Sequence, residues 1–375
     1  MSDRRREVED VKQGLKDKIE DLCRRLLPEG RRQGRLWVSN NPVTQDYKKT
    51  PELKVAVTGD KGAWKDWRTG AKGDVLRLVE YVLQQDFRGA MQWSRDFLGL
   101  ERMTVEERRK FADRVRERAA EDDERARKRA DWDRRESEKL FLGGAMLGAG
   151  TPAEAHARAY LAARAIDLDR IRHLDRTTFR FSPSLEYWTL AEWTIDQVTG
   201  RRIKTRPGPF FPGILAAFRT PLGAHRATHC TFLDPVQPAK ASLPPKKSPR
   251  LMRASTDGAA IWISHGPEGV PPWEATRPVP LILAEGCETG ERLALDIPEA
   301  RVAAGGSISG IGNVPVNFDF ISVVIVAGEN DWDKPQAQRQ LDQSLAKLAA
   351  SGKPLELMKP HAGSDFNDLG KGDVE

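Results

Sequence analysis

The sequence LILAEGCETGERLALD, residues 281–296, and the sequence FISVVIVAGEND, residues 320–331, decide the fold of the C-terminal part of the chain. Leu281–Ala284 is a short apolar run, and a helical pattern follows it through Leu295. Phe320–Ala327 is continuously apolar, which is typical of a strand buried in a parallel sheet. Strands that alternate with helices predict an α/β domain with a mainly parallel sheet over residues 278–375.

Acidic residues follow three predicted strands of this domain. Because ligands bind at the carboxyl ends of strands in open parallel sheets, these acids are candidates for a shared site. Carboxylates gathered at one edge repel each other, and a hard cation such as Mg²⁺ relieves that repulsion. The alternative is that each acid is an ordinary cap or loop residue. The residues concerned are Glu285 after Leu281–Ala284, then Glu329, Asp331 and Asp333 after Phe320–Ala327, then Asp365 and Asp368 after Leu355–Met358.

The whole chain has 375 residues, which is long enough for more than one domain. We therefore predict a multidomain protein of the α+β and α/β classes. Residues 1–100 predict a small α+β module, with a helix over 7–27, short strands, and helices over Val75–Leu83 and Phe87–Leu98. Residues 101–140 contain 14 Lys/Arg and 13 Asp/Glu, which favours a long, solvated helix, followed by a glycine-rich hinge to residue 150. Residues 151–277 predict a mixed α+β domain.

The composition excludes several classes of protein. No run of about 18 apolar residues is present, so no membrane span is predicted. The N-terminus, MSDRRREVEDVK, lacks the apolar segment of a secretory signal. Cys23, Cys230 and Cys287 lie too far apart for a disulfide framework or a Cys₄ zinc site. We therefore expect a cytoplasmic protein. Its net charge of +6 permits a polyanionic partner.

Basic residues cluster upstream of the C-terminal domain. A track of cations with aromatic residues beside it is the pattern that binds single-stranded nucleic acid. Arg201, Arg202, Lys204 and Arg206 form such a group, with Phe210 and Phe211 just after it. Lys240 and Arg250 are further candidates to hold a nucleotide phosphate or a template strand, because cations suit phosphate oxygens. The alternative for each is an ordinary surface cation.

The acidic motifs resemble the Toprim domain of primases and topoisomerases. That family carries Glu-Gly after its first strand and Asp-x-Asp after a later one. The matches are Glu285-Gly286 and Glu329-Asn330-Asp331. The order EGCETGERLAL, AAGGSISGIGNV, VVIVAGEND and PHAGSDFNDL is similar to that of primase-type Toprim proteins of plasmids, phages and integrative elements. Upstream, AYLAARAI, THCTFLDPVQPAKA and SPRLMRASTDGAAIWI resemble the segments that precede Toprim in that group.

The N-terminal segment GAWKDWRTGAKGDVLRLVEYV resembles the end of the primase zinc-binding module. No Cys or His stands at the expected ligand positions, so we expect a module without zinc, held by packing of Trp37, Trp64, Trp67 and Leu76.

Two departures affect the Toprim motifs. Glu329 replaces the first Asp of the Asp-x-Asp pair, and Trp332-Asp333-Lys334-Pro335 stands where a glycine is usual. A metal displaced by about 1 Å costs roughly 10²-fold in rate.

The resemblance implies a DNA primase, a nucleotidyltransferase that synthesises short primers on single-stranded DNA in the replication of mobile elements. It assigns catalysis to Glu285, Glu329 and Asp331, and it implies Mg²⁺ or Mn²⁺ held by Glu329, Asp331, Asp333 and Asp365. The implied partners are single-stranded DNA and NTPs. A replicative helicase would be a separate partner, because the sequence contains no GxxxxGK[ST] loop.

Two other functions stay open. One is a non-catalytic single-stranded-DNA-binding accessory protein that keeps the primase fold, which the Glu329 and glycine departures favour. The other is a Toprim nuclease that uses the same carboxylates, against which the upstream polymerase-like segments argue.

Overall fold

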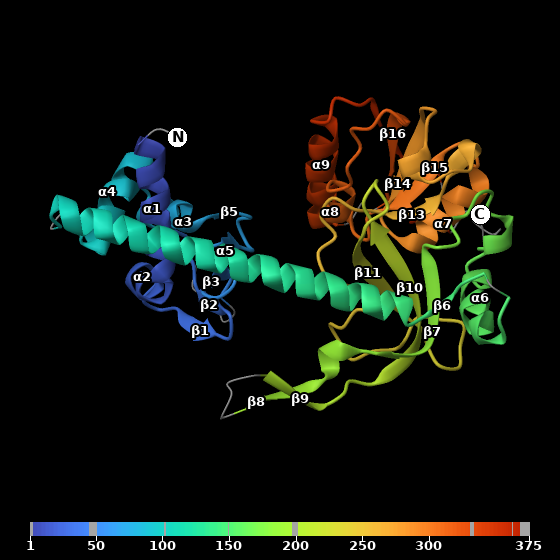
Figure 1. Cartoon of the computed structure of the whole chain (residues 1–375), viewed down its shortest axis with the longest axis horizontal. Helices are drawn as coiled ribbons and strands as arrows, with labels where there is room; N and C mark the ends of the chain where they lie inside the picture. Colours follow the sequence, from blue (N-terminus) through green and yellow to red (C-terminus); the bar gives the residue numbers. More distant parts are fainter. Residues whose placement is uncertain are drawn as a thin grey trace. The chain divides into compact units, whose positions relative to one another are not determined.

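The computed structural model describes residues 3–44, 51–100, 103–148, 150–196, 202–330, 334–361 and 363–367. The chain divides into two compact units, Met1–Lys128 and Arg129–Glu375, each of which is described by itself (Figure 1). The predicted division into four parts stays a prediction. No helix in the ranges just given is long and apolar enough to cross a membrane.

The first unit packs helices against a small antiparallel sheet. Its strands follow one another in the order β1-β2-β3-β4-β5. The helix predicted over residues 7–27 is divided at Lys18 into two helices. Asp74 accepts a hydrogen bond from the backbone N–H of Arg77 and caps α3. The elements are α1 (Asp3–Asp17), α2 (Ile19–Leu26), β1 (Arg31–Gln33), β2 (Leu36–Ser39), β3 (Leu53–Ala56), β4 (Trp64–Asp66), β5 (Lys72–Gly73), α3 (Val75–Leu83) and α4 (Phe87–Leu98).

The core of this unit corrects one prediction. Trp37, Trp64 and Leu76 are buried in one hydrophobic cluster, as expected. Trp67 is instead 55% exposed, and the ammonium group of Lys65 lies 4.0 Å from the centre of its ring. Side chains alternate between the two faces of β4, and Trp64 and Asp66 occupy the buried face. Trp67 follows the strand and is out of this alternation, so its side chain is exposed. Trp67 therefore does not hold the module together.

Asp66 gives this unit a predictable pH response. Burial opposes ionisation of Asp66, but hydrogen bonds from the backbone N–H of Arg68 and from Asn41 outweigh it and hold the pKa below 3.8. A carboxyl whose pKa is lowered on folding stabilises the protein above its unfolded pKa, and this contribution is lost as the pH falls through the folded pKa. We expect the hydrogen-exchange protection of peptides from residues 51–83, relative to their intrinsic exchange rates, to fall below pH 3.8 in the wild type. Asp66→Asn should reduce that pH dependence, whereas the exposed Asp60→Asn should leave it unchanged.

The helix α5 (Val105–Leu142) confirms the charged helix predicted from the sequence. Its last residues belong to the second unit, where they precede an antiparallel sheet with the strand order β12-β11-β10-β7-β6. A separate hairpin, β8 and β9, is inserted between β7 and β10. The elements are β6 (Ala145–Met146), α6 (Ala155–Ala162), β7 (Phe179–Glu186), β8 (Glu192–Ile195), β9 (Arg202–Arg206), β10 (Phe210–Arg219), β11 (His225–Phe232) and β12 (Arg250–Arg253).

The C-terminal sheet is mainly parallel, which confirms the fold class. Its strand order is β13-β15-β14-β16-β17, and only β13 pairs antiparallel. The central strand β14 therefore lies between β15 and β16. The elements are β13 (Ile261–Ser264), β14 (Val279–Ala284), α7 (Cys287–Asp296), β15 (Arg301–Ala304), α8 (Ile308–Ile311), β16 (Ile321–Ala327), α9 (Pro335–Ala349) and β17 (Leu355–Met358).

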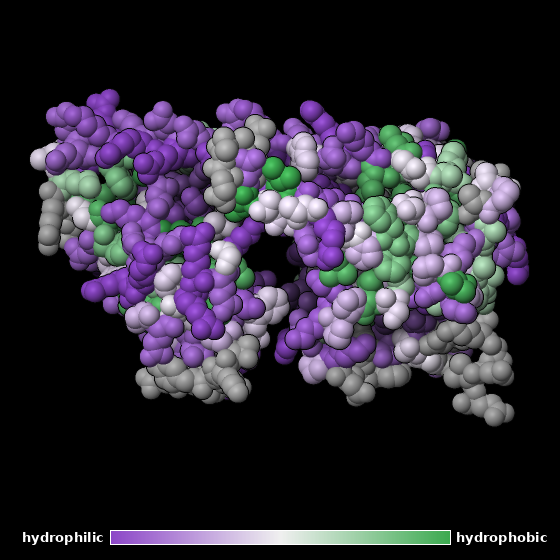
Figure 2. Space-filling model, turned by 90° about the horizontal axis from the view of Figure 1, so that it is seen from below, coloured by the Kyte–Doolittle hydropathy of each residue, from purple (hydrophilic) through white to green (hydrophobic). Residues whose placement is uncertain are grey.

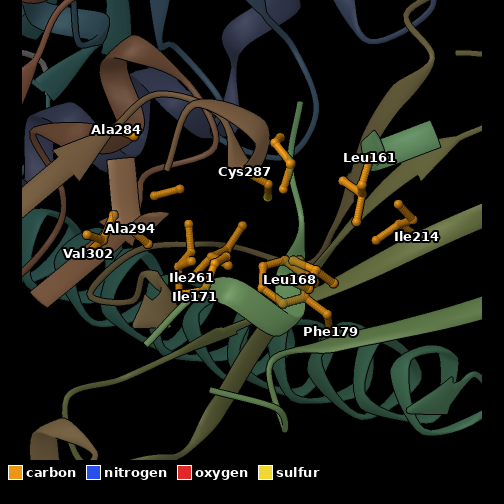
Figure 3. Packing of buried hydrophobic residues seen from close by; sticks show 14 of the residues in the cluster. Leu161, Leu168, Ile171, Phe179, Ile214, Ile261, Ala284, Cys287, Ala294 and Val302 are labelled. Atoms are coloured by element: carbon orange, nitrogen blue, oxygen red, sulfur yellow. The ribbon is translucent and has the colours of Figure 1, made fainter. Parts of the chain in front are cut away.

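One hydrophobic cluster joins the two sheets of the second unit. Leu161 of α6, Phe179 of β7 and Ile214 of β10 lie in the same cluster as Ala284 of β14 and Val302 of β15 (Figure 3). Because interiors pack as densely as organic crystals, such a shared core fixes the C-terminal sheet against the region upstream of it. Hydrophilic residues predominate on the molecular face that Figure 2 shows.

Candidate active site

Two of the predicted acids lie side by side at the carboxyl edge of the C-terminal sheet. Strands β14 and β16 are parallel neighbours, and their last residues, Ala284 and Ala327, are register partners. Glu285 follows the first of these strands at once, and Glu329 follows the second after Gly328. The backbone N–H of Gly328 donates to the carbonyl oxygen of Met358 at the end of β17, so the third strand ends at the same edge.

Glu285 and Glu329 line one small cavity of about 30 Å³. Its apolar wall comes from Ile308 and Ile311 of α8 and from Leu341 of α9, while Lys359 adds a cation beside the two acids. Lys359 was not among the predicted site residues, although its place just after β17 is a signal that could have found it. Glu285 and Glu329 thus place two carboxylates, the hard oxygen donors that divalent cations prefer, at one cavity.

The motif residue between the predicted acids has a structural role. Asn330 is buried, and its side-chain amide donates to the carbonyl oxygens of Pro360, at 2.9 Å, and Gly363, at 3.0 Å. Its backbone N–H donates to the carbonyl oxygen of Ser364 at 2.9 Å. Asn330 thereby ties the end of β16 to the loop that carries Asp365. Asp365 itself accepts a hydrogen bond from the backbone N–H of Asn367 and is not among the residues that line the cavity.

Several predicted site residues lie outside the described residues. These are Asp331, Asp333 and Asp368, together with Arg201. In the part of the chain that is described, no three His, Cys, Asp or Glu side chains form a group that could hold a metal ion. The metal set predicted from the sequence therefore stays a prediction.

Lys240 lies next to the site, in a buried cluster of polar groups. Its ammonium group lies 2.7 Å from a carboxylate oxygen of Glu288, which also accepts a hydrogen bond of 2.6 Å from the hydroxyl of Tyr160. Burial opposes ionisation of Glu288, but the charge of Lys240 and these hydrogen bonds outweigh it and lower the pKa to about 2. Neither Tyr160 nor Glu288 was a predicted site residue, although both stand in motifs quoted for the resemblance.

Two further titratable groups lie in this cluster. His229 is buried, and its burial lowers the pKa of the imidazole to about 4. Glu291 is also buried, and its burial together with the charge of Glu288 raises its pKa well above the ordinary value of 4.5. The cluster therefore places the Glu288 carboxylate and the neutral imidazole of His229 beside Glu291, whose burial favours its protonated form.

Arg250, on the edge strand β12, lies close to the Glu285-Gly286 turn. A Cβ atom added at Gly286 would lie 3.6 Å from one guanidinium nitrogen of Arg250 and 3.5 Å from a carboxylate oxygen of Glu288. The side chain of Arg250 is exposed. The structure thus brings an exposed cation to the turn that carries Glu285, where a phosphate group could be held.

Three other predicted cations, Arg202, Lys204 and Arg206, lie on β9 of the hairpin, and acidic side chains pair with two of them. Lys204 lies 2.7 Å from Glu186, and Arg206 pairs with Glu192. The guanidinium group of Arg202 lies 4.6 Å from the ring centre of Trp193, which is 41% exposed. Trp193 offers a stacking surface that the sequence analysis did not select. Template binding by this hairpin stays a prediction.

A glycine contact behind the cavity supports a testable prediction about stability. A Cβ atom at Gly310 of α8 would lie 2.1 Å from the carbonyl oxygen of Gly305, which is backbone and cannot rotate away. Gly310→Ala is therefore expected to lower the free energy of unfolding by about 1–3 kcal/mol, the usual cost of overpacking. Thermal unfolding checks this, with the exposed Ser309→Ala as the control. Equal melting temperatures for Gly310→Ala and the wild type would show that the two backbone segments are not in contact.

Comparison with known proteins agrees with the C-terminal fold. Residues 280–371 match the model of the Toprim domain, which confirms the resemblance seen in the sequence. Residues 132–263 match a domain of unknown function, DUF7146. No curated protein matches the chain.

The solved structures that the chain resembles include primases. A primase of Aquifex aeolicus, comprising its zinc-binding and RNA polymerase domains, is 12% identical, with a TM-score of 0.35, over 96% of this chain and 81% of that one. A DNA primase domain of Pseudomonas aeruginosa is 16% identical, with a TM-score of 0.39, over 65% and 75%. The primase fragment of the bacteriophage T7 primase-helicase is 11% identical, with a TM-score of 0.33, over 87% and 91%.

Proposed function

We propose that this chain, in which residues 280–371 match the Toprim domain, is a DNA primase that synthesises short primers on single-stranded DNA. The observation that carries the proposal is the shared cavity of Glu285 and Glu329 at the carboxyl ends of adjacent parallel strands. Paired carboxylates at this edge would hold the divalent cations that nucleotidyl transfer needs to neutralise the negative charge of a triphosphate.

We further propose that Glu329, Asp331, Asp333 and Asp365 hold Mg²⁺ or Mn²⁺. When bound, the metal would neutralise triphosphate charge and lower the pKa of the attacking 3′-hydroxyl. Glu285 would orient the reacting groups or accept a proton at its carboxylate. Arg250 and Lys359 would hold phosphate oxygens beside it, because cations form charge-assisted hydrogen bonds with phosphate.

The template and partners complete the proposal. Single-stranded DNA would follow the hairpin of β8 and β9, where Trp193 stacks a base and Arg202 contacts the backbone. The substrates would be NTPs, the setting the replication of a plasmid, phage or integrative element, and the unwinding activity that of a separate replicative helicase. The NTP substrates, the mobile-element setting and the separate helicase rest on the sequence resemblance, whereas the template path rests on the cations and the exposed Trp193 of the hairpin.

A second candidate function is a single-stranded-DNA-binding replication accessory protein without catalysis. Two sequence features favour it: Glu329 stands in place of an Asp, and Trp332-Asp333-Lys334-Pro335 stands where glycine is usual. A nuclease that uses the same carboxylates is a third, weaker candidate.

One assay separates these functions. Wild-type protein is incubated with labelled NTPs, single-stranded DNA and Mg²⁺ or Mn²⁺, and both the template and the new products are resolved on a gel. We expect new labelled oligomers and an intact template. A shortened template would identify a nuclease. Binding without either change, with strong salt dependence, would identify an accessory protein.

A further inference from the structure

The buried cluster around Glu288 links the Glu285 turn to the region upstream of the Toprim domain. Glu288 lies in the first turn of α7, three residues after Glu285. Its two described partners come from elsewhere in the chain: Tyr160 from α6, and Lys240 from the loop between β11 and β12. The backbone of Lys240 is bridged to Leu233, which ties this loop to the end of β11.

Because the ion pair of Lys240 and Glu288 is shielded from water, loss of either partner is costly. The side chain of Glu288 is 8% exposed and that of Lys240 is 22% exposed. A buried charge is tolerated only when it is paired and hydrogen-bonded, so removal of one partner leaves the other uncompensated. Glu291 lies buried in the same cluster, where burial and the charge of Glu288 raise its pKa, so a further negative charge beside Glu288 is disfavoured.

We propose that Lys240 is a positioning residue, which anchors Glu288 together with Tyr160 and so fixes the Glu285-Gly286 turn at the carboxyl edge of the sheet. The effect of this anchor on catalysis rests on the proposed function. Lys240 acts through Glu288, and its ammonium group does not contact a nucleotide phosphate. The anchor also explains how the upstream region and the Toprim domain are coupled at the site as well as through their shared hydrophobic cluster.

The test uses the full chain and four variants: Lys240→Met, Glu288→Gln, the double variant, and Lys247→Met as a control that removes an exposed cation from the same loop. Hydrogen exchange of amides 285–290 is measured relative to that of β16. Lys240→Met is expected to accelerate exchange on the order of a hundredfold, since it leaves a buried carboxylate unpaired. The double variant should return exchange to within roughly threefold of the wild type, because the neutral amide needs no counter-charge. Lys247→Met should exchange like the wild type.

Kinetics provide a second readout if the wild type synthesises primers. A displaced Glu285 lowers kcat and leaves the KM for NTP unchanged, and the double variant recovers kcat. The proposal is overturned if Lys240→Met leaves exchange unchanged and raises KM, or if the double variant exchanges as fast as Lys240→Met. If Lys240→Met does not fold, recovery of folding in the double variant supports the proposal and its absence overturns it. The exchange result holds even if no primers are made, so failure of the proposed function is recognised separately.

Discussion

Glu285→Gln is expected to reduce the rate of primer synthesis by about 10²–10⁴-fold, which is the range that a positioned acid or base contributes. Glutamine keeps the size of the side chain but removes its negative charge and its ability to accept a proton. Glu285 shares its cavity with Glu329 at the ends of adjacent strands, so the charge is lost at the centre of the proposed site. The measurement is the initial rate of labelled oligomer formation at saturating NTP.

The matched control is Glu299→Gln, which removes an exposed carboxylate from the same domain. Its rate should equal that of the wild type, and both variants should melt at the wild-type temperature. If Glu285→Gln retains full activity, the cavity at the carboxyl edge is not where the chemistry takes place.

Asn330→Ala is expected to lower the free energy of unfolding by about 2–4 kcal/mol, because it leaves two carbonyl oxygens without their donor and each unsatisfied buried group costs about 1–3 kcal/mol. The two acceptors are the carbonyl oxygens of Pro360 and Gly363. The loop that carries Asp365 should loosen with them. Urea unfolding measures the loss, and hydrogen exchange of residues 359–367 locates it.

The control for this prediction is Asn317→Ala, an exposed asparagine of the same domain whose replacement should change stability little. A loss confined to a few tenths of a kcal/mol in Asn330→Ala would mean that water satisfies both carbonyl groups equally well. It would also remove the reason to expect that Asn330 fixes the loop.

The sequence was sufficient for the C-terminal sheet because its strands have distinct local patterns. Phe320–Ala327 is continuously apolar, and β16 covers nearly the same residues. The acid after each strand could be placed at the carboxyl edge because parallel strands end there together. Glu285 lies beside Glu329 because β14 and β16 are neighbours in the sheet. The sequence alone does not determine this order of the strands.

Long-range contacts account for what the sequence could not predict. Tyr160, Lys240 and Glu288 are far apart in the chain and meet only after α6 and α7 pack into the same core. The exposure of Trp67 depends on which face of β4 is buried, a choice made by the packing of Trp64. The break at Lys18 lies within a continuous helical pattern, so the spacing of apolar residues does not mark it.

The most direct test of the central claim is primer synthesis on single-stranded DNA by the wild type beside Asp331→Ala, with Mg²⁺ or Mn²⁺ and a metal-free control. The predicted result is metal-dependent oligomers from the wild type and none from the variant, while both proteins bind the template equally. If neither protein makes oligomers in any metal and both bind DNA, the carboxylates at the Toprim edge do not catalyse primer synthesis.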